Sequence, residues 1–227
     1  MVSMVVFDMA GTTVNEDNVV YKTLQKAINK KGFDISLDDV LAEGAGKEKL
    51  EAIQSVLKVY AGNRDKSLAN EIHADFMDLL SKAYEDINVL PQPNAEKLFQ
   101  ILKDRNIRVI LNTGYNADIA EALVKKLGWK KGIQFDSLIT SSDVEKNRPD
   151  PEMIDLAMDI HGVIDPKKVV KVGDSIIDIE EGQNAGCGLN VGITTGAHTY
   201  LQLQSANPDY IINDLMELLP ILDRVRE

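Results

Sequence analysis

The sequence predicts an α/β protein with a doubly wound parallel sheet and an inserted all-helical segment. Short apolar runs rich in β-branched residues recur along the chain, helical patterns separate them from residue 91 onward, and the stretch 15–90 has helical patterns but no clear strand. Apolar runs with little alternation are typical of strands that helices cover on both faces. Regular alternation of such strands with helices favours a parallel sheet.

The predicted strands of the sheet are six short runs, at residues 4–7, 107–111, 137–140, 169–172, 189–193 and 210–212. Apolar stripes at helical spacing predict helices over 94–105 and 116–127. Asn94 is a candidate N-cap for the first of these helices, and Gly128 is a candidate stop for the second.

The insert is predicted to contain helices only. The first covers 18–31 and ends before Gly32, and Ser36 with Asp39 forms a capping box for a short second helix. The third and fourth helices cover about 47–60 and 66–86. The sequence PQP at 91–93, which disfavours helix, follows them. The predicted domains are a Rossmann-like core of residues 1–14 and 91–227 and a helical cap of residues 15–90.

The composition limits the classes of function. The 227 residues are 44% hydrophobic, enough for a sizeable core, and the formal net charge is −11. So acidic a chain repels a phosphate backbone, and we expect no nucleic-acid partner. No apolar run approaches the ~20 residues of a membrane span, the N-terminus lacks signal-peptide features, and Cys187 has no second cysteine to pair with. We therefore expect a soluble, cytoplasmic protein without a membrane partner.

Polar side chains follow the predicted strands at the points where the strands end. Asp8 follows the first strand, Thr113 the second and Asp174 the fourth, with Asp178 one helical turn later. Ligands of open α/β sheets bind outside the carboxyl ends of the strands. Carboxylates packed together repel one another, and Mg²⁺, which prefers oxygen ligands, would offset that repulsion. Taken singly, each aspartate is equally well explained as a helix N-cap.

Two further residues suit an anionic ligand. Thr113 stands beside a glycine at the start of a predicted helix, where hydroxyl and backbone N–H groups can hold a phosphate oxygen. Arg148 precedes Pro149, which fixes the backbone there and lets the arginine project as a fixed cation. Each signal is weak alone, because the threonine also fits a structural cap and Lys146 is a competing cation.

The ordered set of these motifs resembles the haloacid dehalogenase superfamily of hydrolases. DMAGTT at 8–13, Thr113, Arg148 before a proline, and GDSIIDIEEGQNAG at 173–186 match its four motifs, and their spacing covers nearly the whole chain. The insert after the first motif resembles the superfamily's helical cap.

The resemblance implies a mechanism and a set of site residues. Asp8 would be the nucleophile and would form an aspartyl-phosphate, while Thr113 and Arg148 would hold the phosphoryl oxygens. The implied magnesium-binding residues are Asp8, Ala10 through its backbone carbonyl, Asp174 and, close behind, Asp178. The expected substrate-binding residues are Gly11 and Thr12, through their backbone amides, Gly114 and Tyr115.

Ala10 sets this chain apart from ordinary phosphatases of the superfamily, which carry an aspartate at that position. The aspartate protonates the leaving alkoxide, so its loss should cost on the order of 10²–10⁴ in rate. The phosphonatase branch also carries alanine there, and TGY at 113–115 and Arg148 resemble that branch. Its members, the phosphonoacetaldehyde hydrolases, cleave a C–P bond after a cap lysine forms a Schiff base with the aldehyde.

Lys49, in GAGKEKLEAI (44–53), matches the position of that cap lysine. Three interpretations stay open: Schiff-base chemistry, simple binding of an anionic substrate, or a solvated surface lysine. The phosphonatase cap also carries a methionine and a histidine at the positions held here by Ala45 and Ala52. This chain therefore resembles the phosphonatase branch but lacks two of its cap residues. His198 follows a strand and is interpreted as structural.

We therefore expect a Mg²⁺-dependent hydrolase that cleaves a small phosphonate or organophosphate. The alternatives are a phosphatase with a substitute general acid and a catalytically silent regulator that binds phosphate or metal. A metal-free dehalogenase would leave Asp174 and Asp178 unexplained. The resemblance is compatible with a monomer or a homodimer formed through the cap.

Overall fold

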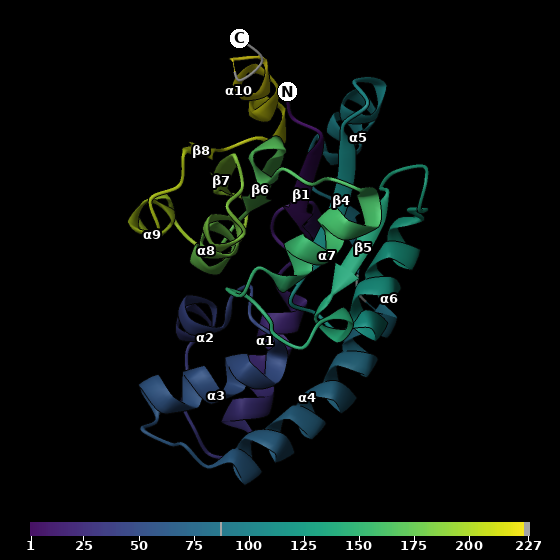
Figure 1. The fold of residues 1–227 in the computed structure, drawn as a ribbon. Helices are drawn as coiled ribbons and strands as arrows, with labels where there is room; N and C mark the ends of the chain where they lie inside the picture. The colour runs from purple at the N-terminus through teal and green to yellow at the C-terminus, as the bar shows by residue number, and fades with distance from the viewer. Residues whose placement is uncertain (87, 225–227) are drawn as a thin grey trace.

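The computed structural model describes residues 1–86 and 88–224 of the chain. A six-stranded sheet with the order β5-β4-β1-β6-β7-β8 forms its centre, and all neighbouring strands are parallel (Figure 1). The strands are β1 (Met4–Asp8), β4 (Arg108–Thr113), β5 (Ser137–Thr140), β6 (Val169–Gly173), β7 (Leu189–Ile193) and β8 (Tyr210–Ile212). The predicted parallel α/β fold is confirmed.

Alternate residues of the central strand β1 enter two hydrophobic cores. Val5 and Phe7 belong to one core, which also contains apolar residues of α5 (Ala95–Asp104), α6 (Ala117–Leu127) and α10 (Leu218–Arg224). Met4 and Val6 belong to the other, together with α7 (Glu152–His161). Because helices cover both faces of the sheet, β1 is buried along its whole length, as its uninterrupted apolar run predicts.

The remaining elements of the sheet domain are short. Helix α8 (Ile176–Asn184) packs on β6 and β7. Helix α9 (Tyr200–Ser205) connects β7 to β8. The 3₁₀ turns η1 (Ser141–Asp143) and η2 (Pro166–Lys168) lie between β5 and β6, and η3 (Leu215–Glu217) follows β8. Gly128 ends α6 in the left-handed conformation, as predicted. Asn94 is the N-cap residue of α5, as predicted, but it is left-handed and its side chain makes no capping hydrogen bond; its amide nitrogen donates to Asp214 at 2.7 Å.

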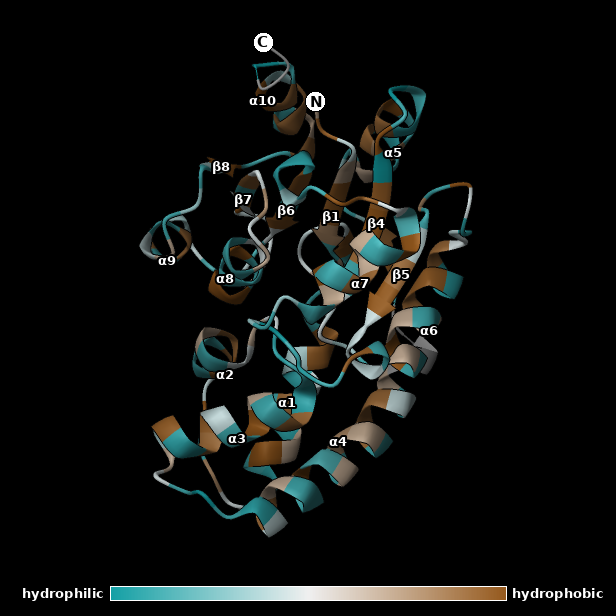
Figure 2. Ribbon diagram, viewed as in Figure 1, coloured by the Kyte–Doolittle hydropathy of each residue, from teal (hydrophilic) through white to brown (hydrophobic). Residues whose placement is uncertain are grey.

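The helical insert follows β1 and returns before α5. Its helices are α1 (Val19–Asn29), α2 (Leu37–Gly44), α3 (Lys49–Tyr60) and α4 (Lys66–Asp86). They turn their hydrophobic residues toward one another (Figure 2), and Leu24, Ile53 and Phe76 lie in the same core. The capping box of α2 is present, since the Asp39 N–H donates to the Ser36 hydroxyl at 3.1 Å and the Ser36 N–H donates to the Asp39 carboxylate at 3.2 Å.

Two short strands join the ends of the insert and were not predicted. Strand β2 (Val14–Asn15) pairs antiparallel with β3 (Leu90–Pro91). A strand of two residues is too short to show the alternation of apolar and polar residues by which strands are predicted, and Pro91 argues against a strand at β3. The predicted domain limits, after residues 14 and 90, cut these strands, so the division into core and cap stays a prediction. Residues 87 and 225–227 of the predicted ranges lie outside the described residues.

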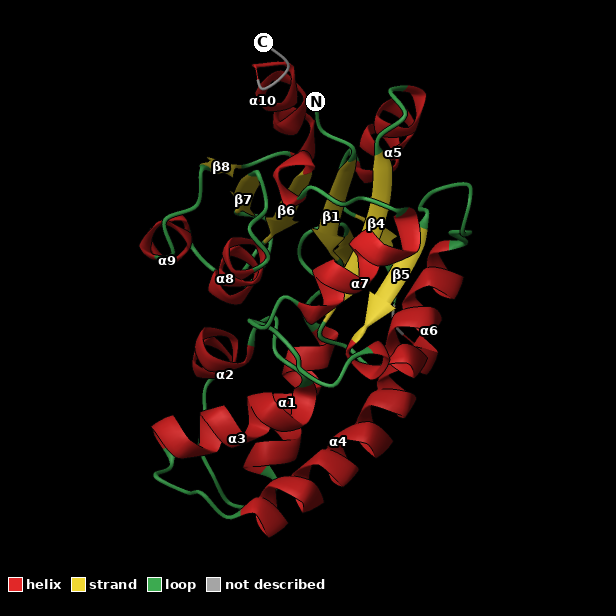
Figure 3. Ribbon diagram, viewed as in Figure 1, coloured by secondary structure: helices red, strands yellow, loops and turns green. Residues whose placement is uncertain are grey.

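The arrangement brings the carboxyl ends of the strands toward the insert. In Figure 3 the strand arrows point to the end of the sheet where α1, α2 and α3 lie. Polar residues at the strand ends therefore face residues that come from the insert. Within the described part of the chain, none of the helices combines the length and hydropathy needed to cross a bilayer.

Candidate active site

The turn after β1 presents Asp8 at the end of the sheet. The N–H groups of Thr12, Thr13 and Val14 all donate to the carbonyl of Met9 at 2.8–3.2 Å. Gly11 has φ +89°, and a Cβ on it would lie 2.5 Å from Oδ2 of Asp174. The position therefore requires glycine on two counts, the left-handed backbone and the close approach of a carboxylate.

The three aspartates predicted at the strand ends meet beside this turn. Carboxylate oxygens of Asp8, Asp174 and Asp178 lie within 4.8 Å of one another, and all three residues are buried. Thr12 donates its hydroxyl to Oδ1 of Asp174 at 2.9 Å, and the Ala197 N–H donates to Oδ2 at 2.6 Å. The protein thus holds Asp174 in one orientation next to Asp8.

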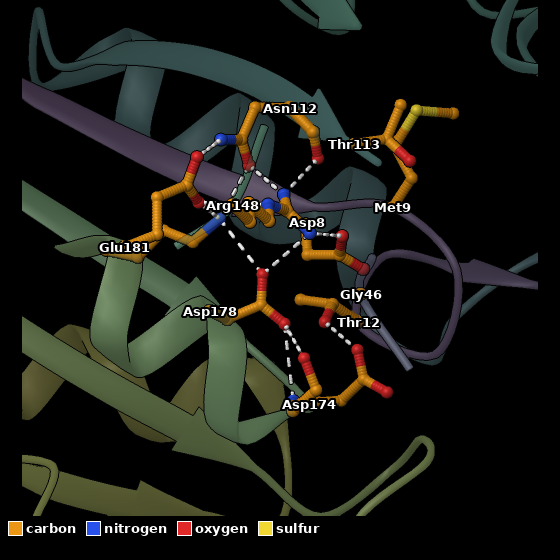
Figure 4. A network of polar contacts seen from close by, with 12 residues as sticks. Asp8, Met9, Thr12, Gly46, Asn112, Thr113, Arg148, Asp174, Asp178 and Glu181 are labelled. Carbon is orange, nitrogen blue, oxygen red and sulfur yellow. Dashed lines mark hydrogen bonds and ion pairs between the residues drawn. The ribbon is translucent and has the colours of Figure 1, made fainter. Parts of the chain in front are cut away.

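Arg148 lies at the centre of the polar network, between Asp8, Asp178 and Glu181 (Figure 4). Its Nη1 lies 2.7 Å from Oδ1 of Asp8 and 2.9 Å from Oδ1 of Asp178, and its Nε lies 3.0 Å from Glu181. Its Nη2 donates to the backbone carbonyl of Asn112 at 2.9 Å. Protein oxygens thus surround the guanidinium, which fixes the Asp8 carboxylate at the strand end.

Lys171 and Glu181 complete the network, and the sequence analysis missed both. Lys171 lies in the middle of β6 with no exposed area, 3.1 Å from Asp178 and 2.8 Å from Glu181. Its ammonium group also donates to Oδ1 of Asn112 at 2.5 Å. A lysine within an otherwise apolar strand is the signal that could have found them, because a buried lysine needs paired carboxylates.

The pKa values of the aspartates reflect this crowding. Burial and the charge of Asp178 raise the pKa of Asp8 to about 6, although Arg148 and Lys171 oppose the shift. Burial and the charge of Asp8 raise the pKa of Asp174 well above its usual value. Burial alone would raise the pKa of Asp178 as well, but Arg148 and Lys171 outweigh it and lower that pKa. Asp8 and Asp174 are thus the carboxyls that lack sufficient positive charge.

The charge balance of the buried network fits a divalent cation. When ionised, its carboxylates (Asp8, Asp174, Asp178 and Glu181) exceed its cations (Arg148 and Lys171) by two charges. Among the described residues, Asp178 is ion-paired with both Arg148 and Lys171, whereas Asp8 is paired with Arg148 alone and Asp174 with neither cation. The donor set that suits a hard cation is therefore Asp8 and Asp174, with Asp178 as support.

The insert contributes Lys49 to the same site. Lys49 begins α3 and is 2% exposed. Its ammonium group donates to the carbonyl of Lys47 and lies 4.9 Å from the ring centroid of Tyr21 and 4.8 Å from that of Tyr115. Burial lowers the pKa of Lys49 to about 8, despite opposing effects of Glu48 and Asp8. The solvated-surface interpretation of Lys49 is wrong.

A small pocket joins these groups. Asp8, Ala10, Lys49, Thr113 and Asp174 line it, together with Tyr21, Gly46, Gly114 and Tyr115. Its cavity volume is about 10 Å³, close to the ~10–15 Å³ that one water requires. The pocket therefore has a buried carboxylate on the sheet side and a buried amine on the insert side.

Not every predicted site residue reaches this pocket. Arg148 and Asp178 lie beneath Asp8 rather than in its lining. The N–H groups of Gly11 and Thr12, expected to face a phosphoryl group, donate instead to the carbonyls of Val14 and Met9. Hydrogen bonding within the tight turn engages both amides, so the structure does not support their expected contact with substrate.

Two further buried groups adjoin the site. Glu16 is 2% exposed, and burial raises its pKa to about 8. The hydroxyl of Tyr115 donates to Oε1 of Glu16 at 3.2 Å. His198 accepts a hydrogen bond at Nδ1 from the Ile176 N–H at 2.9 Å, which fits its structural interpretation. Glu16 carried no signal in the sequence, because an acidic residue after a turn usually lies in solvent.

The comparisons with known proteins agree with this geometry. A family model described as haloacid dehalogenase-like hydrolase matches residues 2–186. The phosphonoacetaldehyde hydrolase of Lactiplantibacillus plantarum is 28% identical, over 100% of this chain and 97% of its own length. A candidate pyrophosphatase, PpaX of Clostridium perfringens, is also 28% identical, with 99% of both chains covered.

A solved structure of a phosphonoacetaldehyde hydrolase-like protein has a similar fold. The phosphonoacetaldehyde hydrolase-like protein of Oleispira antarctica superposes with a TM-score of 0.82 at 20% identity, covering 99% of this chain and 92% of that one. At this identity the likeness supports the fold alone. The family model covers most of the chain, and the predicted motifs of this family lie together at the strand ends. The chain therefore belongs to the haloacid dehalogenase-like hydrolases and is phosphonatase-like.

Proposed function

We propose that this hydrolase cleaves the C–P bond of a small phosphonate aldehyde, with phosphonoacetaldehyde as the first compound to test. The observation that carries the proposal is that Asp8, Ala10 and Lys49 line one pocket. A carboxylate can attack phosphorus there, and an amine can bind the aldehyde. The alanine leaves no acid at the position that protonates an alkoxide. The similarity to a phosphonoacetaldehyde hydrolase over the full chain supports the same substrate class.

Asp8 is the proposed nucleophile. Its carboxylate attacks phosphorus, the C–P bond breaks, and the resulting aspartyl-phosphate is hydrolysed by water. Arg148 holds Oδ1 of Asp8 at 2.7 Å and takes no place in the pocket lining, so we assign it to orienting the nucleophile. With a pKa of about 6, Asp8 is mostly ionised at neutral pH and competent to attack.

Asp8, Asp174 and the backbone carbonyl of Ala10 are the residues proposed to hold Mg²⁺, with Asp178 in support. When bound, the cation would supply the positive charge that the buried network lacks and would offset the charge of the phosphoryl oxygens. Thr113 lines the pocket, and its oxygen accepts from the Tyr115 N–H at 3.1 Å. Its hydroxyl proton is therefore directed elsewhere, which suits a bond to a phosphoryl oxygen.

Lys49 is proposed to form a Schiff base with the aldehyde. Its amine loses its proton near pH 8, so a neutral fraction exists at physiological pH. The lone pair attacks the carbonyl carbon, water leaves, and an iminium forms. When the C–P bond breaks, its electron pair passes to the iminium nitrogen. The rings of Tyr21 and Tyr115 lie within 5 Å of Nζ and stabilise the positive charge.

Phosphate release from purified wild-type and Asp8→Asn protein tests the hydrolase proposal. The panel contains phosphonoacetaldehyde, pyrophosphate and small phosphate esters, each with and without Mg²⁺. We expect Mg²⁺-dependent release from phosphonoacetaldehyde that Asp8→Asn abolishes and that Asp38→Asn, an exposed change on α2, leaves unchanged. Equal release by wild-type protein and Asp8→Asn would refute the nucleophile assignment.

Hydrolysis of pyrophosphate is the second candidate activity. The relative named as a candidate pyrophosphatase supports it, and a phosphate leaving group is a weaker base than an alkoxide, so it is less dependent on the acid that Ala10 removes. The same panel decides between the two, because pyrophosphate turnover would persist when Lys49 is replaced by methionine, whereas turnover of the aldehyde would not.

A further inference from the structure

Glu16 and Lys49 are buried residues of opposite formal charge, and both contact Tyr115. The ring of Tyr115 lies 4.8 Å from Nζ of Lys49, and its hydroxyl donates to Glu16 at 3.2 Å. Tyr115 also lines the pocket. Tyr115 thus connects Glu16 with the pocket.

Neither member of the pair has a close ionic partner among the described residues. No carboxylate lies within salt-bridge distance of Lys49, and no cation lies within that distance of Glu16, in the part of the chain that the structure describes. Glu16 accepts one further hydrogen bond, from the Val20 N–H at 3.3 Å. Burial favours the neutral, proton-carrying form of the Glu16 carboxyl and outweighs these two hydrogen bonds, which favour the charged form.

We propose that Glu16 stores the proton that Schiff-base formation at Lys49 requires and supplies it through the Tyr115 hydroxyl. This inference rests on the Lys49 chemistry of the proposed function. The phosphonatase cap has a histidine near its lysine, and this chain has Ala52 at that position. The inference assigns to Glu16 the proton transfer that a histidine there would otherwise provide.

The proposed step balances in atoms and charge. The neutral amine of Lys49 attacks the carbonyl carbon, and the carbonyl oxygen takes the hydroxyl proton of Tyr115 while Glu16 reprotonates Tyr115. One N–H proton then passes to the new hydroxyl group, and the nitrogen forms a double bond to carbon as water leaves, which yields the iminium and a Glu16 carboxylate. The pair is neutral before the step and consists of one cation and one anion after it. Glu16 thereby provides the counter-charge for the iminium.

The protonation states required for the step overlap around one pH. The pKa of Glu16 is raised to about 8 by burial, with Lys49 opposing and Asp17 assisting the shift. The pKa of Lys49 is lowered to about 8 by burial, with Arg148 assisting and Glu48, Asp8 and Glu16 opposing. Neutral Lys49 accumulates as the pH rises through 8, and protonated Glu16 is lost over the same interval. Adduct formation should therefore be bell-shaped in pH, with its maximum near 8.

Borohydride trapping with phosphonoacetaldehyde, followed by mass mapping of Lys49, tests the proposal. Glu16→Gln keeps the size of the side chain but carries no transferable carboxyl proton. We expect it to slow adduct formation by ~10²–10⁴-fold and to remove the fall above pH 8. Tyr115→Phe keeps the ring beside Lys49 and should slow the step similarly. Asp38→Asn, an exposed change on α2, should match wild type. A wild-type rate and pH profile in Glu16→Gln overturns the proposal.

A second measurement guards against a variant that does not fold. Carbon-13 NMR of glutamate-labelled wild-type protein, without substrate, should show one carboxyl that titrates near pH 8. Titration of every glutamate carboxyl near 4.5 overturns the proposal.

The outcomes also separate this inference from the hydrolase proposal. Phosphate release without any adduct on Lys49 overturns this inference and leaves the hydrolase. An adduct that depends on Glu16, without phosphate release, supports this inference and refutes the hydrolase.

Discussion

Gly114 lies directly against Gly46, so that a Cβ on Gly114 would come within 2.3 Å of the Gly46 carbonyl oxygen. Gly114 follows strand β4 of the sheet and Gly46 lies in the loop before α3 of the insert. The same loop is held by a hydrogen bond from the Gly46 N–H to the Tyr21 hydroxyl at 3.0 Å. The absence of a side chain at Gly114 thus allows the insert to approach the strand ends and brings Lys49 to the pocket.

Gly114→Ala should therefore separate Lys49 from Asp8 without unfolding the protein. A displacement of about 1 Å at a reacting pair can cost ~10²-fold in kcat/KM. Steady-state kinetics and thermal unfolding measure the two effects. Gly192→Ala is the matched control, because a Cβ there makes only ordinary contacts of 3.4 Å or more. Unchanged kcat/KM in Gly114→Ala would contradict the importance of this contact.

Lys171→Met should destabilise the protein strongly. The substitution leaves Glu181 and Asp178 buried with less positive charge, and removal of one partner from a buried ion pair costs about 3–5 kcal/mol. The double variant Lys171→Met/Glu181→Gln should recover part of the lost free energy of unfolding, because the uncompensated carboxylate is gone. Urea denaturation of the four proteins in the cycle measures the coupling, and simple additivity would argue against the pair.

Mg²⁺ should raise the midpoint of thermal unfolding, and this effect should vanish as the pH falls below about 6. Without metal, the raised pKa of Asp8 means that the contribution of this residue to stability is largest below 3.8 and declines as the pH rises through 6. The cation reverses this loss because it binds the ionised carboxylates. Asp174→Asn should abolish the response to Mg²⁺. A response that persists at low pH, or in Asp174→Asn, would contradict the assigned ligands.

Ala10→Asp should raise turnover of phosphate esters. The new carboxyl would occupy the pocket beside Asp8 and could protonate an alkoxide, a contribution of ~10²–10⁴-fold in favourable geometry. Ala10→Asn is similar in size but cannot transfer the proton, so it serves as the control. The measured quantity is phosphate release from small esters. Equal phosphate release by Ala10→Asp and Ala10→Asn would contradict the idea that a proton-transferring group at position 10 is what limits ester hydrolysis.

The sequence predicted those parts of the molecule that depend on local pattern. Apolar runs gave the strands of the sheet because burial on both faces removes polar alternation. Asp8 and Asp174 could be paired across 166 positions of sequence, because parallel strands end at one edge and both follow such runs. The carboxyl end of a strand is thus a feature that sequence alone can locate.

The missed residues depend on contacts between distant segments. Glu16 is buried only because α1 and the residues after β4 enclose it, and no periodicity records that enclosure. Lys171 lies within a run that was correctly predicted as a buried strand, but the prediction did not ask which carboxylates neutralise a buried lysine there. The engagement of the Gly11 and Thr12 amides depends on the turn geometry after Asp8, which residue types alone do not specify.

The size of the pocket has a kinetic consequence. Space for about one water is too small for the proposed substrate, so we expect the insert to move away from the strand ends and return in each turnover. The paired strands β2 and β3 join the insert to the sheet at its base. Such a swing displaces solvent, and turnover limited by it would slow in proportion to the viscosity of the medium. Friction with the surrounding water, rather than the strength of the C–P bond, would then limit the rate.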